Sequence, residues 1–242
     1  MYKGKTLAVI LPTYAERDSI GGVIRDFFAT GVVDEVIVVD NNSQTGTREN
    51  VGGTGARLVA EPRQGFGYAV TKGFRSADAG LIAVCEPDGT FAAQDIFRLL
   101  AHADRTDLVL GSRTNAAFIA EDANMGFFLR CGNILTGKIL STLFSGPGFT
   151  DVGCTMRLIQ SRALRKILPQ FRVNGSAFNM EMTVLALQNG LSVTEVPLTY
   201  KKRVGRSFGS GNWLNCFSIA LQMYFVMLKY RLKPGLPGKN RG

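Results

Sequence analysis

Short apolar runs alternate with helix-like patterns along the first half of the chain, and this alternation constrains the fold more than any other feature. Residues 7–11, 36–39, 81–84 and 108–110 form runs that are rich in β-branched residues and bounded by charges or turns. Such runs are typical of strands buried on both faces of a sheet. Because helical patterns separate them, we predict an α/β fold with a mostly parallel sheet flanked by helices.

The helical pattern after the first run places apolar residues of 20–28 on one side of a helix, which Gly31 is placed to end. In the second half we predict helices over 126–144 and 178–188 and a strand over 193–200. The only histidine, His102, falls in a predicted surface helix over 94–103. An exposed histidine is more frequent at such a position than a catalytic one.

Polar residues follow three of the predicted strands, in the sequences Pro12-Thr13-Tyr14, Asp40-Asn41-Asn42-Ser43 and Glu86-Pro87-Asp88. The carboxyl ends of parallel strands meet at one edge of a sheet, where ligands bind. Carboxylates spaced like Glu86 and Asp88 can reach one hard divalent cation, which can bridge a diphosphate, although a solvated turn gives the same pattern. Asp40 can accept hydrogen bonds from a ribose or base edge, or can serve as a cap or turn residue.

A glycine-containing segment, Arg63-Gln64-Gly65-Phe66-Gly67, precedes another predicted helix. Glycines allow the backbone to approach a ligand closely, and Arg63 can pair with a phosphate or with the carboxylates. The pattern is weak when it stands alone.

The charge balance points to anionic partners, since 28 basic against 19 acidic residues give a net charge of +9. A nucleotide diphosphate, a lipid phosphate or a membrane surface fits this charge. Nucleic acid is disfavoured, because the basic residues are not interleaved with a recognisable binding motif. The four cysteines show neither close pairing nor metal-ligand spacing, so we expect reduced thiols in the cytosol.

The segment 213–232 is strongly apolar, yet Asn215, Ser218, Gln222 and Lys229 lie near one stripe of a helix. The aromatic residues within it and the basic residues behind them suit a helix that lies in a membrane interface. A helix packed on the domain's own core, or on a second copy, fits the same pattern. A membrane span is least favoured, because the polar stripe would face lipid.

Taken in order and spacing, residues 11–16, 38–43, 65–69 and 86–88 resemble family 2 glycosyltransferases with a GT-A fold. Within that family the chain is similar to the dolichyl- or polyprenyl-phosphate mannosyl- and glucosyltransferases. This narrower resemblance rests on residues 111–113, 130–133, 150–157, 178–182 and 203–207. The resemblance covers about residues 6–210, and the ordered set of motifs is stronger than any one of them.

The resemblance implies the site residues and the cofactor. The nucleotide-binding candidates are Pro12, Tyr14, Glu16 and Asp40, to which Arg63 and Gly67 are added. Glu86 and Asp88 would hold Mg²⁺ or Mn²⁺, and Arg113, Arg130 and Arg203 would bind phosphates. Asp151 and Glu181 are candidates for orienting the arginines or sugar hydroxyls, or else structural partners of Arg157.

The sequence departs from the family pattern at three positions. The usual Asp-Asp pair after the second strand is Asp40-Asn41, the metal motif begins with Glu86-Pro87 in place of Asp and a small residue, and Phe208 replaces a lysine of related bacterial enzymes. Donor choice and metal affinity depend on these positions more than the reaction class does.

We therefore expect an inverting enzyme that moves a sugar from a nucleotide-diphosphate sugar to a polyprenyl phosphate. A phosphate oxygen is already ionised at neutral pH, so this acceptor needs positioning rather than a general base. We predict a transferase domain over 1–210, an amphipathic interfacial helix over 211–233 and a flexible basic tail over 234–242, bound peripherally to the cytoplasmic side of a membrane.

Three alternatives stay open. A transferase of the same fold can act on a saccharide or another lipid. A non-catalytic membrane-binding module can retain a degenerate transferase fold. A sugar nucleotidyltransferase is weaker, because the glycine-rich, lysine-bearing start of such enzymes is absent around residues 11–13.

Overall fold

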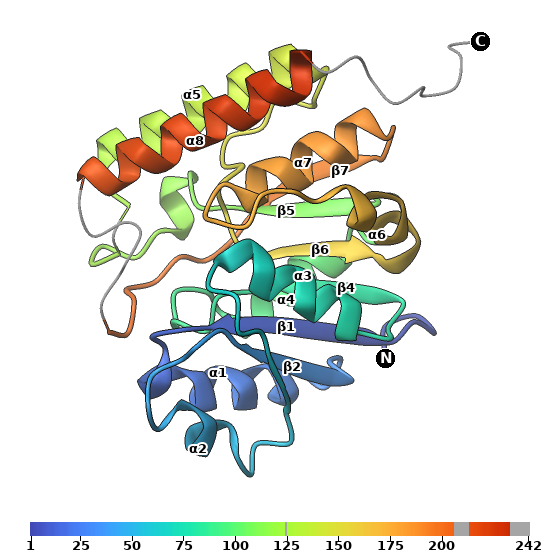
Figure 1. Cartoon of the computed structure of the whole chain (residues 1–242), viewed down its shortest axis with the longest axis vertical. Coiled ribbons are helices and arrows are strands. Elements are labelled where there is room, and N and C mark those ends of the chain that lie inside the picture. Colours follow the sequence, from blue (N-terminus) through green and yellow to red (C-terminus); the bar gives the residue numbers. More distant parts are fainter. Residues whose placement is uncertain (124, 206–212, 233–242) are drawn as a thin grey trace.

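A seven-stranded sheet forms the centre of the structure, a computed structural model that describes residues 1–123, 125–205 and 213–232 (Figure 1). The strand order is β3-β2-β1-β4-β6-β5-β7, and only β6 runs antiparallel to its neighbours. The strands are β1 (Leu7–Thr13), β2 (Glu35–Asp40), β3 (Arg57–Ala60), β4 (Leu81–Val84), β5 (Leu108–Ser112), β6 (Arg157–Gln160) and β7 (Val193–Pro197). The prediction of a mostly parallel sheet is confirmed.

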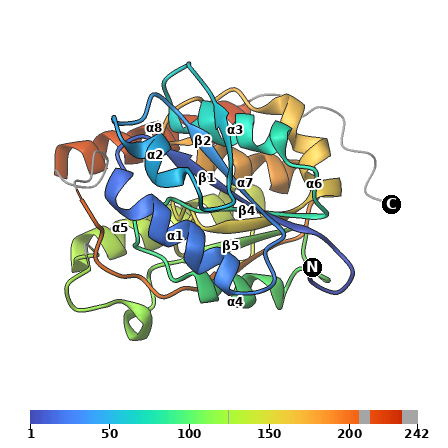
Figure 2. The ribbon, with the colours of Figure 1, turned by 90° about the horizontal axis from the view of Figure 1, so that it is seen from below.

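Helices cover both faces of this sheet. They are α1 (Arg17–Ala29), α2 (Thr47–Val51), α3 (Phe66–Ser76), α4 (Ile96–Leu100), α5 (Phe127–Phe144), α6 (Ser161–Ile167), α7 (Phe178–Gln188) and α8 (Trp213–Leu232), with single 3₁₀ turns at Ala93–Asp95, Ala116–Phe118 and Leu168–Gln170. Figure 2 shows α1 and α4 on one side of the sheet and α3, α6 and α7 on the other.

Strand side chains alternate between two hydrophobic cores, which explains why the strands are apolar along their whole length. Leu7, Val9 and Leu11 of β1 pack with α1 and α4, whereas Ile10 packs with α3 and α7. Gly73 of α3 permits this contact, because a Cβ there would lie 2.4 Å from Cγ2 of Ile10.

The strand order reverses beside β1, whose neighbours are β2 on one side and β4 on the other. In a sheet of this kind the crevice at such a reversal is the usual ligand site. Thr13 pairs in register with Asp40, and β4 ends just before Glu86. The polar strand ends predicted from the sequence therefore share one rim.

Four sequence-based assignments need correction. Strands β3 and β6 were not predicted. The helix expected over 94–103 is a 3₁₀ turn followed by α4, which ends at Leu100, so His102 lies exposed in the turn that follows. The strand expected over 193–200 ends at Pro197, since proline cannot donate to a ladder.

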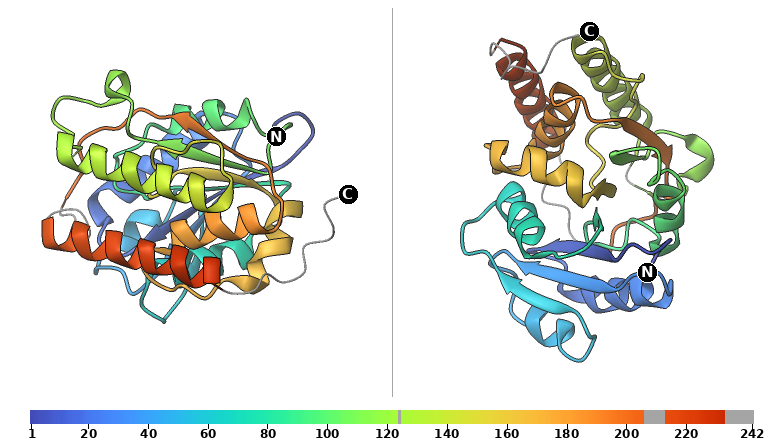
Figure 3. Two further views of the ribbon diagram at one scale, coloured as in Figure 1. Left: turned by 90° about the horizontal axis from the view of Figure 1, so that it is seen from above. Right: turned by 90° about the vertical axis from the view of Figure 1, so that its right-hand side faces the viewer.

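Helices α5 and α8 lie side by side above one edge of the molecule (Figures 1 and 3). Val226, Met227 and Tyr230 of α8 are buried, and Tyr224 Oη lies 3.1 Å from Thr136 Oγ1 of α5. In the described ranges no helix is both long and apolar enough to cross a membrane. The basic tail predicted over 234–242, and Arg206 to Phe208, lie outside the described residues.

Candidate active site

Hydrogen bonds join the three polar strand ends into one rim. Asn41 N donates to Thr13 O at 3.0 Å, joining β2 to β1. Ser19 Oγ, at the start of α1, donates to Pro87 O at 2.6 Å and so ties the β1–α1 turn to the turn after β4. The structure therefore brings the predicted residues Pro12, Tyr14, Asp40, Glu86 and Asp88 to the same edge of the sheet.

An arginine stands among three carboxylates at this rim. Arg203 Nη2 lies 2.6 Å from Asp88 Oδ2 and 3.4 Å from Glu86 Oε2, and Arg203 Nη1 lies 3.8 Å from Glu16 Oε1. Asp88 is buried, and its other oxygen accepts from Thr90 N at 2.9 Å. Burial, and then the Asp88 carboxylate, raise the pKa of Glu86 to about 7, while Arg203 acts in the opposite direction. The cluster is a place that stabilises positive charge.

Glu86 and Asp88 are suited to bind a divalent cation, because their carboxylates already bind the guanidinium of Arg203. The guanidinium of Arg203 already shows that their oxygens converge on one cationic group. Among the described residues, no three His, Cys, Asp or Glu side chains are grouped to hold a metal by themselves. Magnesium in phosphate-transfer sites is commonly held by one or two carboxylates together with substrate phosphates, so two carboxylates suffice.

Asp40 and Asn41 have different roles at the end of β2. Asp40 Oδ1 accepts from Ser43 N at 2.8 Å and its Oδ2 from Arg48 Nε at 2.6 Å. Although burial opposes the shift, these hydrogen bonds lower the pKa of the Asp40 carboxyl. The Asn41 amide donates to Glu61 O at 2.7 Å and Arg63 O at 2.8 Å. Asn41 thus fixes the loop that carries Arg63.

Replacing Asn41 by Asp is expected to lower the free energy of unfolding by about 1–3 kcal/mol, because a carboxylate cannot donate to the two carbonyls and leaves them unsatisfied. Urea unfolding monitored by circular dichroism measures the change. Asn115→Asp is the matched control, because Asn115 is exposed and its Oδ1 accepts from Ala117 N, a bond that aspartate keeps, so its change is expected to stay within about 0.5 kcal/mol. Equal stability of the Asn41→Asp variant and the wild type would contradict this role.

The loop from 61 to 67 is held from both sides. Arg63 forms a two-point ion pair with buried Glu61, at 2.9 Å from Nε and 2.8 Å from Nη2, and its guanidinium lies 4.5 Å from the centre of the Tyr68 ring. Gly67 N donates to Asn174 O at 2.8 Å, and a Cβ on Gly67 would lie 2.3 Å from Val173 O. Position 67 thus needs a glycine because the loop around Val173 and Asn174 leaves no room for a side chain. The sequence pattern alone did not reveal this reason.

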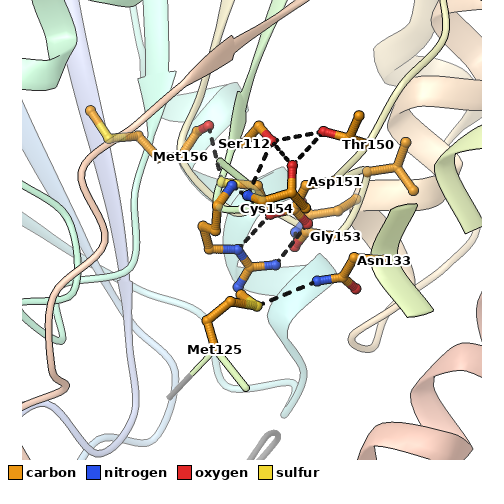
Figure 4. A network of polar contacts seen from close by, with 12 residues as sticks. Ser112, Met125, Asn133, Thr150, Asp151, Gly153, Cys154 and Met156 are labelled. Carbon is orange, nitrogen blue, oxygen red and sulfur yellow. Dashed lines mark hydrogen bonds and ion pairs between the residues drawn. The ribbon is translucent and has the colours of Figure 1, made fainter. Parts of the chain in front are cut away.

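A second buried ion pair lies at the end of β5. Asp151 is fully buried and accepts from Arg113 Nε at 2.8 Å and Nη2 at 2.9 Å. Glu195 of β7 accepts from the amides of Thr150 at 2.9 Å and Asp151 at 3.0 Å, which holds the turn in place. Figure 4 shows Ser112, Thr150 and Asp151 in this network, which faces Asn133 of α5. Asp151 therefore orients Arg113.

The remaining candidates, Arg130 and Glu181, belong neither to the rim nor to the ion pair of Arg113 and Asp151. Arg130 is on the first turn of α5, three residues before Asn133 and hence on the same side of that helix. Among the described residues its side chain forms neither a hydrogen bond nor an ion pair. Glu181 is fully buried in α7, where it accepts from backbone amides and from Tyr230 Oη, so it contacts neither the arginines nor the rim. Arg157 pairs with neither acid and donates instead to backbone carbonyls, such as Asn179 O at 3.0 Å.

Comparisons with known proteins agree with this geometry. The sequence model of glycosyl transferase family 2 matches residues 8–168. An uncharacterized glycosyltransferase of Mycobacterium tuberculosis is 31% identical over 203 residues, covering 84% of this chain and 88% of the relative. A dolichyl-phosphate hexose transferase of Haloferax volcanii is 29% identical over 209 residues, covering 85% and 87%.

Among solved structures, glucosyl-3-phosphoglycerate synthase of Mycobacterium tuberculosis, in complex with Mn²⁺, UDP and glucosyl-3-phosphoglycerate, matches with a TM-score of 0.73. The match covers 94% of this chain and 80% of that chain at 17% sequence identity. It establishes the fold and leaves the acceptor open.

Proposed function

The chain belongs to glycosyl transferase family 2, and we propose that it transfers a sugar from a nucleotide-diphosphate sugar to a polyprenyl phosphate. The glycosyltransferase activity follows from the family, whereas the donor, the acceptor and the metal are our proposal. The Haloferax relative carries the name dolichyl-phosphate hexose transferase, and the solved structure with the same fold contains UDP and Mn²⁺.

The donor side of the proposal uses the rim residues. Pro12, Tyr14, Glu16 and Asp40, with Arg63 and Gly67, would surround the nucleotide. Glu86 and Asp88 would hold Mg²⁺ or Mn²⁺, which when bound would stabilise the negative charge of the departing diphosphate. Arg203, freed from Asp88 by a competing cation, would then be available for a phosphate.

The position of Gly153 carries the choice of a lipid-linked acceptor. A Cβ on Gly153 would lie 3.3 Å from Met223 Cε of α8 and 3.6 Å from Arg113 Nη2. Gly153 therefore lies between the oriented arginine and α8, the helix that exposes the most large apolar side chains among the described residues. A lipid phosphate fits both features, because its headgroup needs the arginine and its chain needs an apolar surface.

The proposed reaction is a single in-line displacement. A phosphate oxygen of the acceptor attacks the anomeric carbon, the bond from that carbon to the diphosphate breaks, and the configuration inverts. The attacking oxygen carries no proton at neutral pH, so Arg113, Arg130 and Arg203 position and neutralise charge and no side chain has to act as a base.

The proposed membrane contact uses the outer face of α8. Leu214, Phe217, Leu221, Phe225, Leu228 and Leu232 are exposed at helical spacing, and Phe127 and Phe128 of α5 are exposed as well. Lys229, Arg231 and Lys138 on the same two helices are also exposed, which favours an anionic bilayer.

Changing both Phe217 and Phe225 to Ser is expected to weaken binding to vesicles of anionic phospholipid at least about tenfold, since each phenylalanine contributes about 1.5–3 kcal/mol when buried. Vesicle co-sedimentation measures the loss. Phe97→Ser, on exposed Phe97 of α4, is the control and should bind as the wild type does. A wild-type dimer that this double change separates, with no vesicle binding by either protein, would assign the face to a second copy.

The whole proposal is tested by transfer of radiolabelled sugar from a panel of UDP- and GDP-sugars to undecaprenyl and dolichyl phosphate, with and without chelator. Chelator-sensitive product that extracts into organic solvent is expected. If no labelled product forms with any donor, while the protein still binds nucleotide, the proposal of a lipid-phosphate acceptor is overturned in favour of a saccharide acceptor.

A further inference from the structure

Glu181 is a buried carboxylate that the proposed reaction does not use. It is fully buried in α7, and its Oε2 accepts from Arg172 N at 3.0 Å and Val173 N at 2.9 Å. Its Oε1 accepts from Tyr230 Oη of α8 at 2.5 Å. Burying a carboxylate costs several kcal/mol and is tolerated where its hydrogen bonds fix a particular arrangement. The arrangement fixed here is the loop 172–174.

Loop 172–174 packs against the segment that contains Gly65 and Gly67. Asn174 O accepts from Gly67 N at 2.8 Å, and a Cβ on Gly65 would lie 2.4 Å from the same oxygen. On the opposite side, Gly65 N donates to Asn41 Oδ1 at 2.8 Å. The Gly65–Gly67 segment is held between Asn41 of the rim and loop 172–174. A shift of loop 172–174 would therefore move the Gly65–Gly67 segment relative to Asp40.

We propose that Glu181 and Tyr230 are positioning residues for donor binding, which they influence through loop 172–174 and Gly67. The inference rests on the proposed donor site. It also gives α8 a second role, because the helix whose outer face we assign to the membrane supplies the Tyr230 hydroxyl. The packing of α8 on α7 would thereby influence the rim residues that we propose to bind the donor.

Hydrogen–deuterium exchange tests the positioning without any ligand. In Tyr230→Phe, and more strongly in Glu181→Leu, peptides that cover 64–70 and 171–175 should exchange faster, while peptides of β1 keep the wild-type rate. Gln188→Ala is the matched control: Gln188 Nε2 donates to Tyr230 O at 2.8 Å, so the change weakens the same helix pair without touching the loop. Unchanged exchange at 64–70 in both test variants, or equal acceleration throughout the chain, overturns the proposal.

Nucleotide affinity tests the consequence for donor binding. Calorimetric titration of Tyr230→Phe with GDP and UDP in the presence of Mn²⁺ should show affinity reduced about tenfold for the nucleotide that the wild type binds, as expected of a misplaced binding loop. Gln188→Ala should match the wild type. Faster exchange at 64–70 with unchanged nucleotide affinity overturns the link to the donor. A wild type that binds neither nucleotide contradicts the proposed function, and the exchange result still decides whether Glu181 and Tyr230 hold the loop.

Discussion

Replacing Asp88 by Asn is expected to lower the rate of sugar transfer by about 100- to 1000-fold, the usual cost of one well-placed electrostatic group. Asp88 is 1% exposed, and its Oδ1 accepts from Thr90 N at 2.9 Å. Asparagine can keep that bond, so the turn is expected to survive. The amide would instead face Arg203 without a charge, and the proposed cation site would lose one of its two carboxylates.

Initial rates measured across a Mn²⁺ titration, together with direct Mn²⁺ binding by calorimetry, separate lost metal from lost fold. Weaker Mn²⁺ binding by a protein with wild-type circular dichroism is expected. Asp107→Asn serves as the control, because Asp107 accepts from Ser192 N at 3.0 Å at the opposite end of the strands. A rate for Asp88→Asn within threefold of the wild type would remove Asp88 from the mechanism.

The parts of the fold that sequence reasoning recovered are those with a local signal. Strand β4 was predicted at its observed bounds because it is a continuous apolar run, and helix α7 because apolar residues recur along its whole length up to Asn189-Gly190. Strand β3 is a four-residue edge strand whose side chains are mostly exposed, and β6 has only Leu158 and Ile159 between Arg157 and Gln160, so neither shows the pattern of a strand buried on both faces. The charge of Arg157 is compensated inside by carbonyls distant in sequence, which a local pattern cannot show.

The residues of the candidate site also divide into those that a local sequence signal predicts and those that it does not. The strand ends at Asp40 and Asp88 were predictable, because the position of a residue after a strand fixes its place on the rim. Partners were not predictable, since Arg203 reaches Glu86 across 117 residues and Glu195 reaches Thr150 across 45. Glu195 gave only the weak signal of one acid in a predicted strand. Asn41 looked like a departure from the family, and only the structure shows that its amide group holds the Arg63 loop.

Replacing Asp151 by Ala is expected to lower the free energy of unfolding by about 3–5 kcal/mol, because it leaves the Arg113 guanidinium without its partner. Asp151 is fully buried, and Arg113 is 17% exposed. For a chain of 242 residues this corresponds to a decrease in melting temperature of about 6–20 °C. Glu35→Ala, which breaks an exposed pair with Arg57, is the control and should cost about 0–1 kcal/mol.

A double-mutant cycle separates the structural from the functional part of this pair. Arg113→Met combined with Asp151→Ala removes both charges, so the double variant should be more stable than the sum of the single losses predicts. Its transfer rate should nevertheless stay low, because the proposed phosphate contact of Arg113 is gone. Recovery of transfer along with stability would show that Arg113 serves only the fold, and the phosphate would then have to be held by Arg130 and Arg203.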